Sequence, residues 1–254
     1  MIKENKYNFG LVSVSFRNYT PRDILQVMKE TKLSCIEWGS DIHAPCNETE
    51  KLMEISTLQK EYGIKCCSYG TYFRLGQTPV EELNNYISAA KILGTNVLRL
   101  WCGTKSGKYY TTTERRNLIN ECRTASEIAE RQNVILCMEC HMDTYTENLS
   151  DAISLMKEIN SENFRMYWQP FQSKSQDENL AYAEAIAQYT VNIHVFQWKN
   201  EKRFSLNEGI KEWQSYLSKF SVPRTLLLEF MPDDRIDSLE AEVKALKTII
   251  GESI

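Results

Sequence analysis

Long apolar runs and an excess of positive charge are both missing from this sequence. The first ten residues, MIKENKYNFG, are charged, and no later stretch approaches the roughly 18 apolar residues that a membrane span needs. Thirty Lys and Arg residues face 34 Asp and Glu residues, which gives a net charge of −4. We therefore expect a cytoplasmic protein with no membrane or nucleic-acid partner and with a small molecule as its ligand.

Linkers are missing as well. No Pro/Gly/Ser-rich stretch or block of like charge divides the 254 residues, and this length is enough for one full core, so we predict a single domain over 1–254. No Gly-x-Gly-x-x-Gly follows the first predicted strand. Dinucleotide binding by a doubly wound open sheet, the alternative α/β fold, therefore has no support.

Eight cysteines are present, but they are scattered along the chain. We expect them to be reduced thiols that act as small hydrophobic residues. Cys137 and Cys140 lie three residues apart on a predicted strand, where their side chains point to opposite faces roughly 10 Å apart. This spacing excludes a disulfide or a shared zinc ion.

Short β-rich runs alternate with capped, helix-like segments along the whole chain. The predicted strands are 9–16, 35–39, 65–70, 96–101, 134–139, 164–169, 191–196 and 225–230. Thr20 and Pro21 mark the start of one helix, and the last helix is predicted over about 237–250. Consecutive strand centres are about 30 residues apart, the length of a βα unit. Eight units in about 250 residues predict an α/β fold, the (β/α)₈ TIM barrel.

In such a barrel, reactive groups gather at the carboxyl ends of the strands. His43 and His141 follow predicted strands, and His194, the only other histidine, lies near the end of one. Four of the five tryptophans also lie at or just after strand ends: Trp38, Trp101, Trp168 and Trp198. Tryptophans here either plug the barrel mouth or stack on the apolar face of a sugar ring.

The alternation of side chains along a strand indicates which residues point into the barrel. It allows four polar residues to occupy the last inward positions of the last four strands: Glu139, Gln169, His194 and Glu229. Carboxylates and imidazole around one pocket favour a divalent cation, with Mn²⁺, Mg²⁺, Co²⁺ and Zn²⁺ all open. Two carboxylates could also exchange a proton with a substrate beside a carbonyl. The alternative is that these groups are only solvated or hydrogen-bonded.

Two further pairs of charged residues each allow two interpretations. Glu37 and Arg99 lie on strands that share side-chain layers, and we favour a buried structural ion pair over substrate contact. Lys199 and Arg203 follow the seventh predicted strand. They could meet a phosphate or a carboxylate, but we favour solvated loop charges.

At this point the residues resemble the xylose isomerase-like TIM barrels, the sugar phosphate isomerase/epimerase superfamily. The positions of Glu139, His194 and Glu229 carry this likeness over essentially the whole chain. Four stretches are similar to a bacterial subgroup described as sugar (phosphate) isomerases or epimerases: IEWGSDIHAP (36–45), SYGTYFRLG (68–76), MECHMDTYTEN (138–148) and MYWQP (166–170). The resemblance implies a carbohydrate or sugar phosphate as substrate. We leave a homo-oligomer open.

The resemblance also implies roles for individual residues. Glu139 and Glu229 would be metal ligands that double as acid and base, and His194 would be a third ligand. Where the family has an Asp followed three residues later by a His, this chain has Gln169 and Gln172, and we favour the Gln169 amide oxygen as a weaker fourth ligand. The predicted substrate-binding residues are Trp38, His43, Tyr69, Arg74, Trp101, His141, Trp168 and Arg203.

The implied reaction removes a proton next to a carbonyl and passes through an enediolate. A keto-polyol dehydratase or lyase would begin with the same step, and a metal-free, non-catalytic sugar-binding barrel is the third alternative. Apurinic endonucleases share this barrel but need a zinc cluster and a basic groove. Three histidines and a negative net charge argue against that function.

Overall fold

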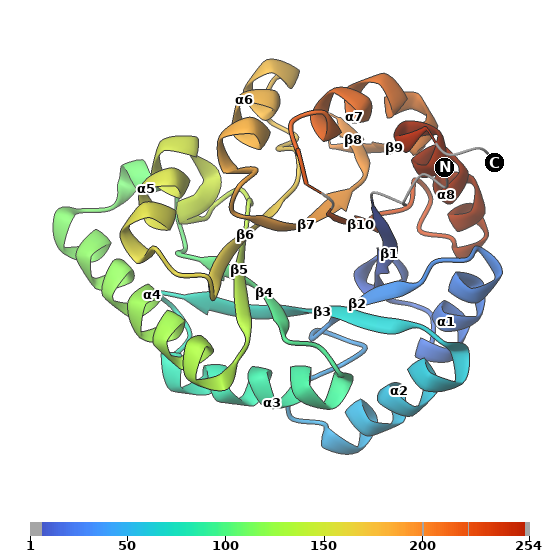
Figure 1. Ribbon diagram of the computed structural model, residues 1–254, viewed down its shortest axis with the longest axis horizontal. Helices are drawn as coiled ribbons and strands as arrows, with labels where there is room; N and C mark the ends of the chain where they lie inside the picture. Colours follow the sequence, from blue (N-terminus) through green and yellow to red (C-terminus); the bar gives the residue numbers. More distant parts are fainter. Residues whose placement is uncertain (1–6, 200, 223, 252–254) are drawn as a thin grey trace.

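The computed structural model describes residues 7–199, 201–222 and 224–251. Parallel strands close into a barrel in the order β1-β10-β7-β6-β5-β4-β3-β2, and Figure 1 shows the helices encircling them. The barrel strands are β1 (Asn8–Val12), β2 (Cys35–Gly39), β3 (Lys65–Leu75), β4 (Val97–Cys102), β5 (Ile135–Glu139), β6 (Phe164–Trp168), β7 (Thr190–Val195) and β10 (Thr225–Leu228). The predicted (β/α)₈ barrel is confirmed, and the doubly wound sheet is excluded.

The helices fill the intervals between these strands. They are α1 (Pro21–Glu30), α2 (Thr49–Tyr62), α3 (Leu83–Leu93), α4 (Thr112–Gln132), α5 (Leu149–Ile159), α6 (Gln176–Ile186), α7 (Ile210–Leu217) and α8 (Leu239–Ile250). The predicted start of α1 is confirmed, because Thr20 and Asp23 form a capping box before Pro21. No helix among the described residues is long and apolar enough to cross a membrane.

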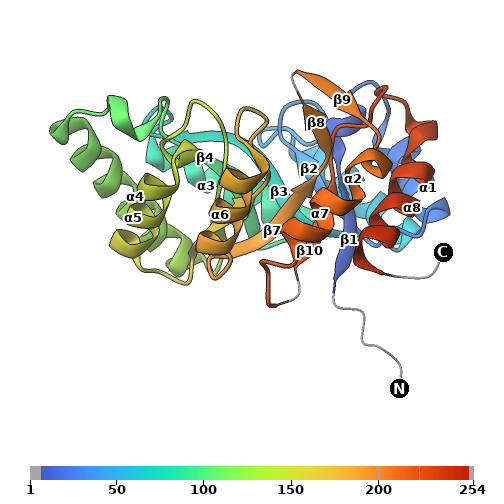
Figure 2. The same cartoon turned by 90° about the horizontal axis from the view of Figure 1, so that it is seen from above.

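The structure differs from the predicted strands at three places that shape the barrel mouth, one being β3, which was predicted over 65–70 and runs to Leu75. The first strand ends at Val12, and the rest of the predicted run, Ser13–Phe16, is a 3₁₀ helix. A short antiparallel hairpin that was not predicted, β8 (Gln197–Lys199) with β9 (Lys202–Phe204), follows β7. Figure 2 shows this hairpin projecting at one end of the barrel. The segment after β1 is thus helical instead of extended, and the loop after β7 contains a hairpin that the sequence does not indicate.

Alternation along the strands separates two apolar layers. Cys137 and Tyr167 belong to a small cluster inside the barrel, whereas Met138 and Trp168 belong to the large cluster between strands and helices. All eight cysteines are free thiols, as predicted. Because the inward positions of β5 and β6 alternate in this way, the residues that end these strands on the inner face, Glu139 and Gln169, point toward the barrel mouth.

Candidate active site

Three residues from different strand ends, Glu139, Gln169 and Glu229, converge on one ring nitrogen of His194. His194 Nδ1 lies 3.4 Å from Glu139 Oε1 and 3.3 Å from Glu229 Oε2. The same atom is hydrogen-bonded to Gln169 Oε1 at 3.3 Å. Gln169 is oriented by its own Nε2, which donates to the carbonyl of Cys140 at 3.1 Å. The sequence prediction that these four residues share one mouth agrees with this geometry.

Two carboxylate oxygens thus face a nitrogen that is already hydrogen-bonded to an amide. Glu229 Oε2 is buried and has no hydrogen-bond partner among the described residues, an arrangement that costs free energy unless a cation or a donor is nearby. Within the described ranges, His, Cys, Asp and Glu side chains alone form no group of three or more arranged to hold a metal ion. Glu139, His194 and Glu229 alone are therefore not arranged as a cation site here, and the Gln169 oxygen is the further donor that a divalent cation would use.

Glu139 is held in place by two donors on its other oxygen. Arg99 Nη1 lies 2.8 Å from Glu139 Oε2, and Trp101 Nε1 donates to the same atom at 2.5 Å. Burial raises the pKa of Glu139, but the charge of Arg99 and the contact with His194 more than offset it and hold that pKa well below its usual range. Glu139 is therefore a fixed anion whose Oε1 remains directed at His194.

Glu37 supports the same cluster from behind. Its Oε1 lies 3.2 Å from Arg99 Nε and 3.4 Å from His194 Nε2, and Ser68 Oγ donates to its Oε2 at 2.7 Å. Burial raises the pKa of Glu37, yet His194, Arg99 and Ser68 lower it to about 2. The predicted Glu37–Arg99 ion pair is confirmed. Its contact with His194 was not predicted, and it orients the ring in the way that carboxylates orient metal-binding histidines.

Burial and neighbouring charges shift the pKa values of the two central ionisable groups, His194 and Glu229. For His194, burial lowers the pKa, but the carboxylates of Glu229, Glu37 and Glu139 raise it to about 10 in the metal-free protein. For Glu229, burial raises the pKa to about 7 with help from Glu139, although His194 opposes this. Glu229 is the carboxyl of this cluster whose pKa lies closest to neutrality, as a general base requires.

Three of the predicted substrate-binding residues form one wall beside Glu139. The Arg74 guanidinium lies 4.6 Å from the centre of the Trp101 ring. The centre of the His141 ring lies 5.3 Å from the same point. Arg203 lies across the mouth on β9, where it pairs with Asp234 and packs over Trp198. The mouth thus offers aromatic faces and cations around the carboxylates.

Three other predicted substrate-binding residues point away from the barrel mouth. Trp38 Nε1 donates to Gln59 of α2, Tyr69 donates to the carbonyl of Ala44, and Trp168 packs against Trp213 of α7. All three are fully buried. They follow or precede an inward residue by one position, so alternation places them against the helices. The expectation that Trp38, Tyr69 and Trp168 bind substrate is therefore wrong.

His43 is also removed from the mouth. Its Nδ1 contacts Ser13 Oγ at 3.2 Å and its Nε2 contacts the carbonyl of Tyr19 at 3.1 Å. Burial lowers the pKa of His43. Both ring nitrogens are engaged with the loop after β1, so this histidine stabilises the rim and leaves no polar atom for a ligand.

The family model described as "Xylose isomerase-like TIM barrel" matches residues 25–248. The chain belongs to this family. A curated relative, the 3-dehydroshikimate dehydratase of Bacillus anthracis, is 23% identical over 172 residues, which cover 62% of this chain and 60% of that protein. The match thus spans less than two thirds of the relative's length.

Two solved structures with the same fold contain a bound sugar or a bound metal. A D-psicose 3-epimerase of Clostridium cellulolyticum H10, solved with D-tagatose, superposes with a TM-score of 0.71 at 10% identity, over 97% of this chain and 100% of that one. The IolI protein, solved with a zinc atom, gives 0.75 at 13% identity over 96% of each chain. At these identities the likeness shows the shared fold.

Proposed function

We propose that the protein is a sugar isomerase or epimerase that removes a proton from a carbon next to a carbonyl. The observation that carries this proposal is the buried Glu229 oxygen, which has no hydrogen-bond partner among the described residues and lies 3.3 Å from His194. Burial raises the pKa of Glu229 to about 7 although His194 opposes the rise, which suits this carboxylate to accept a proton. The aromatic wall of Trp101 and His141 beside Glu139 suits a sugar ring.

The proposed reaction begins with transfer of a substrate proton to Glu229. Glu229 takes the proton, the electrons of the C–H bond form a C=C bond, and the carbonyl oxygen becomes the oxyanion of an enediolate. Return of the proton to the neighbouring carbon, with the hydroxyl proton moving to the oxyanion, completes an isomerisation. Epimerisation needs a proton delivered to the same carbon from the opposite face, so Glu139 would first have to take up a proton from solvent. Arg99 and Trp101 hold Glu139 ionised, which opposes that step, whereas the isomerisation route needs only Glu229.

A divalent cation held by Glu139, Gln169, His194 and Glu229 would polarise the carbonyl and stabilise the negative charge of the enediolate. The residues of the chain would orient the ligands and exclude water. Arg99 keeps Glu139 oriented, Glu37 orients His194, and the walls of the mouth exclude water from the reacting carbon.

Dehydration is the second candidate, and the match to a 3-dehydroshikimate dehydratase favours it. It would begin with the same proton transfer to Glu229. A hydroxyl on the carbon beyond the enediolate would then leave with a proton as water, and the substrate would keep a new C=C bond. This route also needs one base, so the geometry of Glu229 serves it equally.

Product analysis separates these functions. We expect the purified protein, supplied with Mn²⁺, to convert at least one member of a panel of ketoses and keto-polyols into a product of unchanged mass, as followed by NMR and mass spectrometry. A product lighter by one water would establish the dehydratase instead. Binding without turnover of any member would contradict both reactions and favour a sugar-binding barrel.

Gln169 gives a test of the cation site that does not depend on turnover. Replacing Gln169 by Asp adds a negative charge where the amide oxygen contacts His194 Nδ1, so we expect the affinity for Mn²⁺ to rise at least about tenfold, or ~1.4 kcal/mol. Calorimetric titration of the wild type and Gln169→Asp measures this. Gln188→Asp, which adds the same charge at an exposed position beyond the end of α6, is the matched control. Equal gains in both variants would show that Gln169 is not a ligand.

A further inference from the structure

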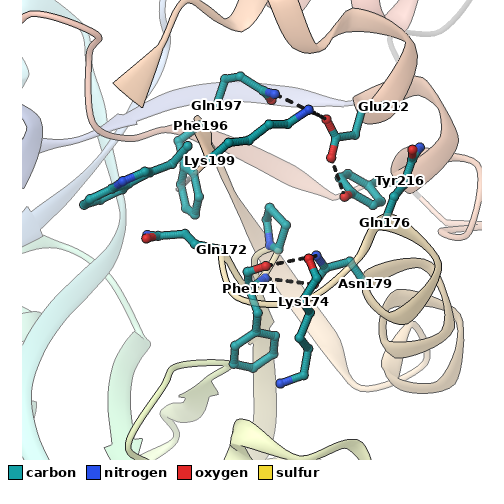
Figure 3. Close-up of a pocket in the computed structure, with 12 residues that line it drawn as sticks. Phe171, Gln172, Lys174, Gln176, Asn179, Phe196, Gln197, Lys199, Glu212 and Tyr216 are labelled. Atoms are coloured by element: carbon teal, nitrogen blue, oxygen red, sulfur yellow. Dashed lines mark hydrogen bonds and ion pairs between the residues drawn. The ribbon is translucent and has the colours of Figure 1, made fainter. Parts of the chain in front are cut away.

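A second cavity lies beside the mouth, and we call it the side chamber. It encloses about 260 Å³ between the loop 170–176 after β6 and the hairpin residues 197–199, with Glu212 and Tyr216 of α7 behind them. Figure 3 shows these groups around the opening. The volume is just below the roughly 300 Å³ at which sites for drug-sized ligands begin, so the chamber suits a single ring rather than a long chain.

The side chamber adjoins the candidate active site. A narrow space of about 30 Å³ is lined by Gln169 and His141 and shares four of its residues with the chamber: Pro170, Phe171, Gln172 and Phe196. Because Gln169 belongs to the candidate active site, this space places the side chamber next to that site. Gln172, which lines both cavities, stands at the junction.

The charges of the side chamber are already engaged. Glu212 pairs with Lys199 at 2.8 Å and accepts hydrogen bonds from Gln197 and Tyr216, a cluster visible in Figure 3. Lys174 Nζ donates to the carbonyl of Glu147 and lies over the Phe171 ring. A phosphate entering the chamber would therefore have to break an existing ion pair or draw Lys174 from its carbonyl.

The groups of the side chamber that remain available to a ligand are uncharged. The amide of Gln172 makes no hydrogen bond within the described part of the chain, and it lies between the aromatic side chains of Phe171 and Phe196. Gln176 presents a second amide at the exposed rim. Amides that donate and accept, together with aromatic faces, match the hydroxyls and apolar face of a neutral sugar ring.

We infer that the side chamber binds an uncharged sugar ring joined to the ring that reacts at Glu229, so that the substrate is a neutral reducing disaccharide, which keeps a carbonyl group, rather than a sugar phosphate. The assignment of the reacting half rests on the proposed function. The assignment of the second ring rests on the side chamber alone, and it can be tested by binding without turnover.

The test compares ligands by calorimetry and saturation-transfer NMR on the full chain. The probes are glucose, glucose 6-phosphate and four neutral reducing disaccharides: cellobiose, maltose, lactose and isomaltose. We expect at least one disaccharide to bind with a dissociation constant at least tenfold below that of glucose. Gln172→Trp, which narrows the junction, should raise that constant to the value for glucose and leave glucose binding unchanged. Gln188→Ala, an exposed glutamine beyond the far end of α6, is the control and should change neither.

Three results would overturn the inference: no disaccharide binds more tightly than glucose, glucose 6-phosphate binds more tightly than every disaccharide, or Gln172→Trp keeps the preference of the wild type. Failure of the proposed reaction looks different. In that case the disaccharide preference and its loss in Gln172→Trp would persist, while no substrate would be turned over.

Discussion

Replacing Glu229 by Gln should lower turnover by about 10³-fold, because a positioned general base contributes about 10²–10⁴-fold. The amide keeps the size of the side chain but cannot accept the substrate proton. The fall corresponds to about 4 kcal/mol of transition-state stabilisation, and steady-state kinetics on the substrate found in the product screen would measure it. Substrate affinity should change far less, so the loss should lie in kcat.

A matched control uses another buried glutamate. Glu242 of α8 is 4% exposed and accepts hydrogen bonds from Ser205 and the backbone of Leu206, both at 2.9 Å. Glu242→Gln should keep kcat within about twofold of the wild type, since this residue lies outside the mouth. If Glu229→Gln retained more than a tenth of the wild-type kcat, Glu229 would not be the base.

Removing the charge of Arg99 should produce the largest loss of stability. Arg99 is 4% exposed and bridges Glu37 and Glu139, so Arg99→Met leaves two buried carboxylates with His194 alone as their cation. We expect the free energy of unfolding to fall by about 3–5 kcal/mol, as for other broken buried ion pairs. Urea unfolding followed by tryptophan fluorescence and circular dichroism would measure it.

A double-mutant cycle separates this ion pair from general packing. Arg99→Met combined with Glu37→Gln should cost less than the sum of the two single changes, because the second change removes a carboxylate that the first left unpaired. Arg99→Met alone should also weaken Mn²⁺ binding, since Glu139 loses the donor that orients it. A loss below about 1 kcal/mol in Arg99→Met would mean that solvent reaches and screens these carboxylates.

The regular βα spacing and the rule of alternation were enough to predict the barrel and the residues at its centre. Glu139, Gln169, His194 and Glu229 lie at or next to strand ends at inward positions, and in the structure the other three surround one atom of His194. The same rule, applied to every strand, would have excluded Trp38 and Trp168, because each is one position away from an inward residue. A shift of one position along a strand reverses the face on which a side chain lies.

The parts of the mouth that sequence reasoning missed have no periodic signal. The strands β8 and β9 have three residues each, too few to show alternation. The contact between Glu37 and His194 joins β2 to β7 across the barrel interior, and no local pattern reports a contact between strands that are not neighbours. The side chamber likewise depends on how the loop after β6 and the hairpin fold against α7.

The central claim is that Glu229 removes a proton from a carbon next to the carbonyl of a bound sugar. Incubation in heavy water with the metal-loaded protein, followed by NMR of the recovered sugar, tests this claim directly. We predict that the wild type replaces that one C–H proton by deuterium, also in substrate that has not been converted, and that Glu229→Gln does so about 10³-fold more slowly. Turnover of the sugar with no deuterium at that carbon, or equal exchange in both proteins, would contradict it.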